Sequence, residues 1–150
     1  MIAKLVQKYN FVVELLTGLK DIPLLMMRLV LAYGFYTTAA VKWSNIEGVS
    51  EWFGSLGIPA PLLNTYLAAS AEAAGVVLLT LGFATRIISI PLIITMVVAI
   101  VTVHLHNGFE AAENGFEIPL YYFIMLLTLV INGAGKISAD NFIQKYLSRN

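Results

Sequence analysis

Hydrophobic residues form four long runs along the chain, and short segments rich in polar residues separate them. The runs cover residues 22–42, 61–83, 86–106 and 117–135. A helix needs about 20 residues to cross a bilayer, because it rises about 1.5 Å per residue. The pattern therefore predicts four transmembrane helices. The fourth run reaches that length only when its more polar flanks are included.

Two further segments have amphipathic patterns, one near each end of the chain. In residues 2–20, apolar residues recur at helical spacing with charged and polar residues between them. This pattern predicts a helix that either lies in the membrane interface or packs against the bundle. The segment has no uncharged stretch followed by a small-residue cleavage site, so no signal peptide is expected. Residues 138–150 are expected to form an amphipathic tail.

The segment between the first two runs is too short and too mixed in polarity to span. Ser44 and Glu47 have the spacing of a capping box, and apolar residues follow at helical intervals. A short helix over residues 45–56 is therefore expected to lie across the outer mouth of the bundle. It either rests in the interface or covers a pocket as a lid. The predicted fold is an all-α integral membrane four-helix bundle in one domain.

The composition supports a membrane environment. Hydrophobic residues make up 59% of the chain and charged residues 12%, about half the charged share of a typical soluble domain. The chain has no cysteine, which excludes disulfides, thiolate chemistry, cysteine-bound clusters and covalently attached c-type haem. Any redox function would need a non-covalent carrier or another subunit.

The charges are distributed unevenly across the predicted membrane. One side carries almost all of the basic residues: Lys4, Lys8, Lys20, Arg86, Lys136, Lys145 and Arg149. The opposite loops contain only Lys42 as a cation and carry five acids: Glu47, Glu51, Glu110, Glu113 and Glu117. Basic loops remain cytoplasmic, so both termini are expected in the cytoplasm and the outer face is acidic. The net charge of zero gives no reason to expect a nucleic acid partner.

Glu72 lies in the middle of the second run. An acidic side chain at a helix centre costs roughly 2.5–3.5 kcal/mol on insertion scales, so the position is a candidate functional site. Arg28 would lie about 9 Å inside the cytoplasmic end of the first helix, and Glu72 about 15 Å from either end of the second. Either Arg28 or another cation pairs with Glu72, or Glu72 faces a cavity and carries a proton.

A polar column from all four helices is predicted around this acid: Arg28, Lys42, Glu72, His104 and Glu117. Each of the other members also has a structural explanation. Lys42 and Arg28 can extend toward the two membrane surfaces, His104 can form interfacial hydrogen bonds, and Glu117 can stabilise a helix N-terminus.

The outer loop repeats the sequence Asn-Gly-Phe-Glu at 107–110 and 114–117. Four of its residues are weak candidates for metal ligands: His104, His106, Glu110 and Glu117. His104 and His106 are two residues apart, so one helix face cannot present both. A solvated acidic loop is the expected state, and no metal is expected.

Several short motifs occur in the order typical of one family. They are the Lys42–Trp43 pair, LGIPAP at 56–61, a glutamate in the second run, LGFATR at 81–86, NGFE before a proline, and GAGKISAD at 133–140. With these motifs, the chain resembles the DoxX family from about residue 24 to residue 140. That resemblance implies a small four-helix protein of a bacterial or archaeal inner membrane, similar to the large subunit of a thiosulfate:quinone oxidoreductase. It also implies recurrent polar positions at Arg28, Lys42, Glu72, Arg86, His104, Glu117 and Asp140.

The leading hypothesis is a membrane subunit of a quinone-linked oxidoreductase that works with a redox partner subunit. Glu72, Arg28 and His104 would carry protons as the catalytic group. Lys42, Glu117, Tyr36, Tyr66 and Tyr121 would line the substrate slot, together with Phe35 and Tyr122. The quinone would be bound non-covalently.

Two alternatives remain open at the level of sequence. A binding or transport module would use Arg28 and Lys42 as anion contacts and Glu72 as the coupling group. Transporters are commonly built from repeats, which this chain lacks, and a homodimer could supply the second copy. A non-catalytic scaffold for partner enzymes would need Glu72 only for folding or assembly.

Overall fold

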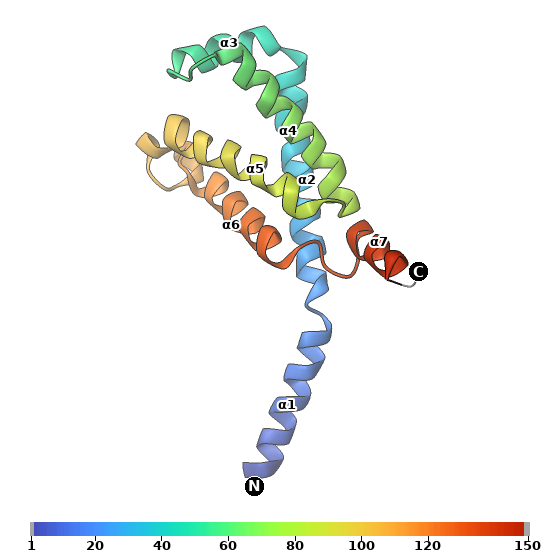
Figure 1. Ribbon diagram of the computed structural model, residues 1–150. Helices are drawn as coiled ribbons and strands as arrows, with labels where there is room; N and C mark the ends of the chain where they lie inside the picture. The colour runs from blue at the N-terminus through green and yellow to red at the C-terminus, as the bar shows by residue number, and fades with distance from the viewer. Residues whose placement is uncertain (1, 149–150) are drawn as a thin grey trace.

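The computed structural model describes residues 2–148, with side chains from residue 4 onward, and this part of the chain is helical without any strand. Seven α-helices follow one another (Figure 1): α1 (Ile2–Gly18), α2 (Asp21–Ser44), α3 (Ile46–Ser55), α4 (Pro61–Leu81), α5 (Thr85–Ala99), α6 (Glu117–Asn132) and α7 (Ala139–Leu147). The predicted all-α class is confirmed.

Three helical stretches are long and apolar enough to cross a membrane. They are Lys4–Ser44, which joins α1 and α2, Pro61–Leu81, and Thr85–Asn107. The fourth apolar helix, α6, has only 16 residues. It stops at Asn132 because Gly133 has a left-handed backbone, with φ +77°, and the chain cannot continue as a helix there.

The third stretch changes its helical geometry near its outer end. After α5, residues Ile100–His104 form a π-helical turn, in which the Leu105 N–H donates to the Ile100 carbonyl. A short 3₁₀ turn, Leu105–Asn107, then leads into the outer loop. Such π turns contain one residue more than the α-helix around them.

The apolar helices pack in neighbouring pairs. α2 lies along α4 and α5 along α6, and α4 and α5 are also neighbours (Figure 1). The buried core is formed by Leu31, Phe35, Leu79, Leu92, Leu126 and Leu129, with Ala32 and Ile88 beside them. Two glycines make this packing possible. A methyl group on Gly75 would come within 2.8 Å of Leu92, and one on Gly34 would collide with the Tyr122 hydroxyl.

The connection between α4 and α5 is tight, as the sequence predicted. Gly82 ends α4 with φ +66°, and Ala84 also has a left-handed backbone, with φ +48°. A connection of three residues forces α4 and α5 to run antiparallel. The two N–H groups at the start of α5 are satisfied by a carboxylate from the C-terminal segment.

α1 extends away from the other helices (Figure 1), and every side chain from residue 4 to residue 20 is exposed. The expectation that this segment packs on the bundle is therefore wrong. The other expectation for it, a helix in the membrane interface, is taken up below.

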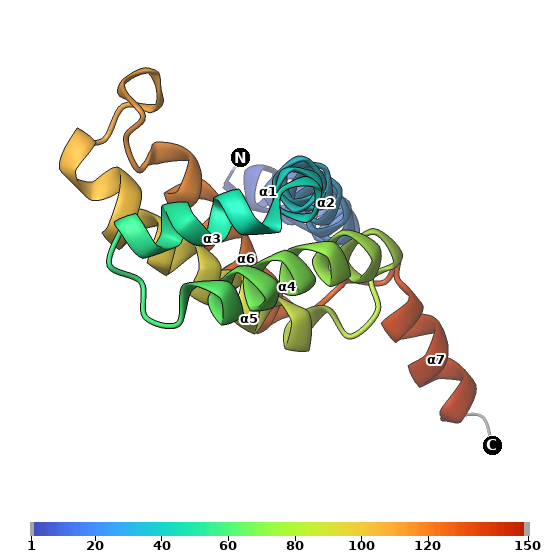
Figure 2. The ribbon, with the colours of Figure 1, turned by 90° about the horizontal axis from the view of Figure 1, so that it is seen from above.

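α3 packs on α4 and crosses the end of the bundle (Figure 2). Its N-cap is Asn45, whose Oδ1 accepts a hydrogen bond of 3.1 Å from the Gly48 N–H. The predicted Ser44–Glu47 capping box is wrong. Ser44 is still the last residue of α2, and its hydroxyl donates to the Val41 carbonyl at 2.8 Å.

Candidate functional site

Glu72 is paired with a lysine inside the helix bundle. It lies in the middle of α4 with 3% of its surface exposed. The Lys42 Nζ donates to Glu72 Oε1 at 3.0 Å and to Oε2 at 2.9 Å. This is the only salt bridge within the described part of the chain. Of the two outcomes that the sequence left open for Glu72, the structure contains the ion pair.

Lys42 approaches the acid from the end of a helix. It stands in the last turn of α2, where a cation is favoured by the helix dipole. Its side chain is 17% exposed and is directed toward Glu72, so the ammonium does not extend to the membrane surface. The loss of either partner would leave a buried, uncompensated charge, which in proteins costs several kcal/mol.

Arg28 does not meet Glu72. Its Nη2 donates to the Ile137 carbonyl at 2.7 Å, while its Nε and Nη1 are buried and have no hydrogen-bond partner. The guanidinium lies against Gly82, where an added methyl group would collide with Nη1. Gly82 is about 15 Å from Glu72 along α4. The C-terminal segment brings the Ile137 carbonyl closer to Arg28 than the Glu72 carboxylate is. No pattern in the sequence predicts that this segment folds back onto α2.

The C-terminal segment forms a second polar cluster at this end of the bundle. Asp140 accepts hydrogen bonds from the N–H groups of Ala84 at 2.8 Å and Thr85 at 3.2 Å, and its own N–H donates to the Gly82 carbonyl at 3.0 Å. The Lys136 N–H donates to Asp21 Oδ1 at 2.8 Å. Asp140 entered the sequence analysis only through the family resemblance. A local signal for a helix start was present in the sequence: Ser138 is a good N-cap residue, and the acidic Asp140 follows it in the first turn.

His104 and Glu117 stand at the two ends of the outer loop and contact residues of the loop and of the start of α6. The His104 Nδ1 lies 2.8 Å from the Asn114 carbonyl. Glu117 accepts hydrogen bonds from the Ala111 N–H at 3.0 Å and from the Tyr121 hydroxyl at 2.9 Å. The predicted column is therefore divided into three parts: the Lys42–Glu72 pair, the Arg28 cluster and the outer loop.

The repeated Asn-Gly-Phe-Glu sequence closes this loop on itself. The rings of Phe109 and Phe116 meet edge to face, with their centroids 5.5 Å apart. The N–H groups of Phe116 and Glu117 donate to the carbonyls of Gly108 and Phe109, both at 3.0 Å. In residues 2–148, no three potential ligands of the types His, Cys, Asp and Glu gather as a metal site would require. The weak candidates, which included His106 and Glu110, are not brought together.

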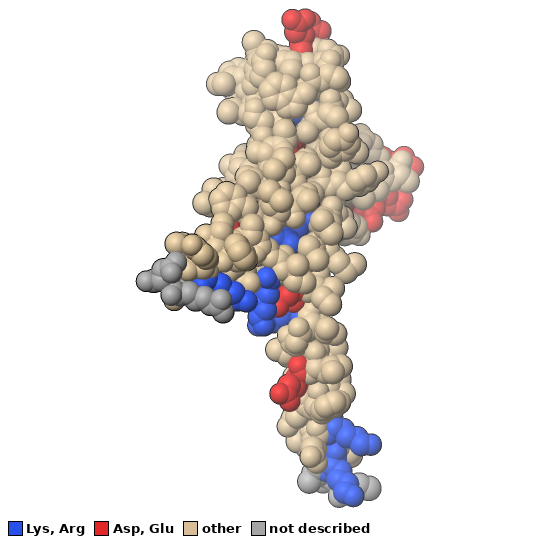
Figure 3. Space-filling view, turned by 90° about the vertical axis from the view of Figure 1, so that its right-hand side faces the viewer, with Lys and Arg blue, Asp and Glu red and all other residues tan. Residues whose placement is uncertain are grey.

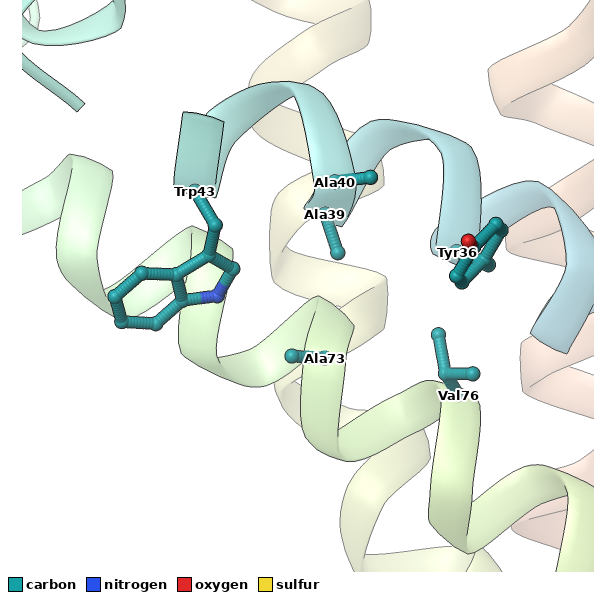
Figure 4. A pocket seen from close by; sticks show the side chains of 6 residues that line it. All are labelled: Tyr36, Ala39, Ala40, Trp43, Ala73 and Val76. Atoms are coloured by element: carbon teal, nitrogen blue, oxygen red, sulfur yellow. The ribbon is translucent and has the colours of Figure 1, made fainter. Parts of the chain in front are cut away.

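An apolar groove lies between α2 and α4, close to the ion pair in the sequence. Six residues line it (Figure 4): Tyr36, Ala39, Ala40, Trp43, Ala73 and Val76. Its volume is about 210 Å³. Trp43 follows Lys42 and Ala73 follows Glu72, so the same turns of the two helices carry the pair and the groove.

Trp43 is held in place by contacts with α4. Its Nε1 donates to the Ala69 carbonyl at 3.2 Å, and its ring meets Tyr66 edge to face with centroids 6.1 Å apart. Tyr36 and Tyr66 thus lie on or beside the groove. Tyr121 lies with Glu117, and Phe35 is a core residue that packs on Tyr122. Tyr36 was predicted to line the slot and lines this groove, whereas Trp43 was noted in the sequence only as part of a family motif.

The apolar helices and the buried Lys42–Glu72 pair show that this chain is a helical membrane protein with an internal ion pair. A family model, DoxX, matches residues 23–105, which include both members of the pair. The chain belongs to the DoxX family.

Curated relatives cover most of the chain. An uncharacterized protein of Haemophilus influenzae is 32% identical over 133 residues, which is 83% of this chain and 85% of the relative. A protein of Bacillus subtilis with the name "Putative oxidoreductase CatD" is 30% identical over 128 residues, 83% of this chain and 90% of the relative. No solved structure matches the chain.

Proposed function

We propose that this protein is a membrane subunit of a quinone-linked oxidoreductase and that the groove between α2 and α4 holds the quinone ring. The observation that carries the proposal is the buried Lys42–Glu72 pair, which stands on the same helical turns as an apolar, aromatic groove. The name of the Bacillus subtilis relative supports oxidoreductase chemistry in the family.

The groove has the properties that a quinone ring requires. Ala39, Ala40 and Ala73 line its middle, and the Trp43 indole and the Tyr36 ring stand at its two ends (Figure 4). Tyr36 is 60% exposed and brings the one side-chain hydroxyl among the lining residues. We assign to this hydroxyl a hydrogen bond to a quinone carbonyl.

The ion pair supplies acid and base groups on the same turns of α2 and α4 as the groove, and neither of its side chains lines the groove itself. A bound quinone takes up two electrons and two protons when it is reduced. Glu72 can hold or release a proton, and Lys42 stabilises the charged carboxylate. The chain has no cysteine to hold a cluster, so the electrons come from a redox partner subunit or a non-covalently bound carrier.

The proposal includes a topology with four spans in a bacterial or archaeal inner membrane and both termini in the cytoplasm. α6 is about 24 Å long, somewhat short for the hydrocarbon layer. The residues that flank it and local thinning of the bilayer make up the difference. α1 continues roughly along the line of α2 (Figure 1), so its placement in the membrane interface requires a bend at the break between Gly18 and Asp21, which would cover its apolar residues with lipid.

Quenching of Trp43 fluorescence tests the quinone site. The chain has two tryptophans, so Trp52→Phe leaves Trp43 as the only one. We expect saturable quenching when a short-chain ubiquinone is added to this variant in nanodiscs. Ala40→Leu fills the groove and should abolish the saturable part. Ala74→Leu is the matched control, because Ala74 is an exposed alanine of α4 outside the groove. Quenching that stays linear with quinone concentration would exclude the site.

A further inference from the structure

The last helix, α7, is fixed to the bundle at the end where α4 turns into α5. Three elements hold the segment that leads into it. From α2, Arg28 donates a hydrogen bond to the Ile137 carbonyl, and Asp21 accepts one from the Lys136 N–H. Asp140 accepts hydrogen bonds from the N–H groups of Ala84 and Thr85, at the end of the turn between α4 and the start of α5. Its own N–H donates to the Gly82 carbonyl at the end of α4. The start of α7 is itself capped, since the Ser138 hydroxyl accepts from the Asn141 N–H at 3.2 Å. The direction in which α7 leaves the bundle is therefore defined by the fold.

Beyond this anchor, α7 has no helix to pack on. Figures 1 and 2 both show it directed away from the other helices. Four large apolar side chains remain exposed: Phe142 at 72%, Ile143 at 41%, Tyr146 at 64% and Leu147 at 69%. Their spacing places them on one face of the helix, and Gln144 lies on the opposite face. An apolar face of this size in water would be costly.

The surroundings of α7 are basic. Lys136 and Lys145 are exposed on the segment itself, and Lys20 and Arg86 are exposed at the same end of the bundle. Figure 3 shows Lys and Arg side chains gathered where α1 joins the other helices, with acidic atoms beside them. The two nearby acids, Asp21 and Asp140, are engaged with backbone N–H groups. The free charge at this end is positive.

We propose that α7 lies in the head-group layer of the membrane and binds anionic phospholipids. Its apolar face enters the acyl boundary, while Lys136 and Lys145 contact lipid phosphates. Charge complementarity favours an anionic lipid surface over a second copy of this chain, which would bring the same positive charges. The inference rests on the proposed topology, which places this end at the cytoplasmic leaflet, and it does not depend on the quinone.

The absence of cysteine allows a direct test with single spin labels. Phe142→Cys places a nitroxide on the apolar face, and Gln144→Cys places one on the polar face of the same helix as a matched control. In nanodiscs of phosphatidylcholine with phosphatidylglycerol, the Phe142 label should collide mainly with oxygen, which dissolves in lipid. The Gln144 label should collide mainly with a water-soluble nickel chelate. Tyr146→Cys provides a second apolar position in case the first variant does not fold.

The role of the charges is tested in the same system. Removing phosphatidylglycerol, or combining Phe142→Cys with Lys136→Gln and Lys145→Gln, should raise nickel-chelate access at position 142. Equal nickel access at positions 142 and 144 would overturn the proposal, as would an unchanged result without the anionic lipid. Spin coupling between two copies at position 142 would show a protein interface in place of a lipid surface. None of these readouts involves quinone, so their failure is separate from failure of the groove site.

Discussion

Among the residues that the structure describes, two charged side chains are buried, Glu72 and Arg28, and they have different kinds of partner. Both carboxylate oxygens of Glu72 accept hydrogen bonds from Lys42, which lies 30 residues earlier in the chain. Arg28 has one carbonyl, 109 residues later, and keeps two nitrogens without a hydrogen bond. Depth along a helix is readable from the sequence, and it placed both residues within the predicted membrane spans. The partners were not readable, because the direction of a long side chain depends on which helices pack together.

The Lys42–Glu72 pair can be tested by removing one charge and then both. Lys42→Met leaves Glu72 buried without its cation, and we expect a loss of roughly 3–5 kcal/mol in the free energy of unfolding at neutral pH. The measurement is denaturant unfolding in detergent micelles. The double variant Lys42→Met/Glu72→Met should recover most of this loss, because an apolar pair of similar volume carries no uncompensated charge. A single variant as stable as the native chain would show that the pair contributes nothing to folding.

The ends of the helices are set by individual residues, and the sequence predicts some of these better than others. The second predicted helix was expected to end at residue 83, and Gly82 ends α4 one residue earlier. The start of α3 was misplaced by one residue, since Ser44 and Asn45 are both good capping residues. The backbone decides between them: Asn45 has φ −150° and ψ 64°, outside the helical region. Neither angle can be derived from the sequence pattern.

Gly82 has two separate reasons to be a glycine. Its φ is +66°, and an added methyl group would meet Arg28 and lie 2.7 Å from the Ser138 Cβ. Gly57 provides a matched control, since its φ is +76° and its Cβ would meet no atom within 4 Å. We expect Gly57→Ala to cost about 1 kcal/mol from backbone strain alone. Gly82→Ala should cost clearly more in the same thermal unfolding assay, because it also displaces Arg28. Equal costs for the two variants would mean that the C-terminal segment adjusts freely.

At the scale of the whole molecule, the sequence predicted the helical class and the apolar runs but not their packing. Membrane helices are apolar on all sides, so the pattern does not mark which face meets another helix and which meets lipid. Exposed residues such as Leu29, Val30 and Tyr33 stand on the same helix as the fully buried Leu31. The contact of the C-terminal segment with α2 was hidden for a related reason. It depends on backbone carbonyls and N–H groups, which every sequence contains.

The proposed orientation predicts which loops can be labelled from outside the cell. Glu113→Cys lies in the outer loop and Gln144→Cys in α7, and both parent residues are exposed. A membrane-impermeant maleimide added to whole spheroplasts should react with the cysteine at 113 at once, and with the cysteine at 144 only after permeabilisation. This follows from the excess of Lys and Arg on the α7 side. The native chain has no thiol and serves as the blank. The reverse labelling order would place the termini outside.

The π-helical turn at Ile100–His104 lets the outer loop vary independently of the packed helices. Removing one residue from this turn would restore regular α-helical bonding and rotate the end of this helix, up to Asn107, by about 100° relative to α5, while α6 stays fixed by its packing on α5. Leu92, two turns earlier, would keep its place against Gly75, whereas His104 would lose its alignment with the Asn114 carbonyl. A deletion or insertion of a single codon here can therefore change the orientation of the outer loop, which is the surface that a partner outside the membrane would meet. Evolution can alter that face without disturbing the interior that contains the ion pair.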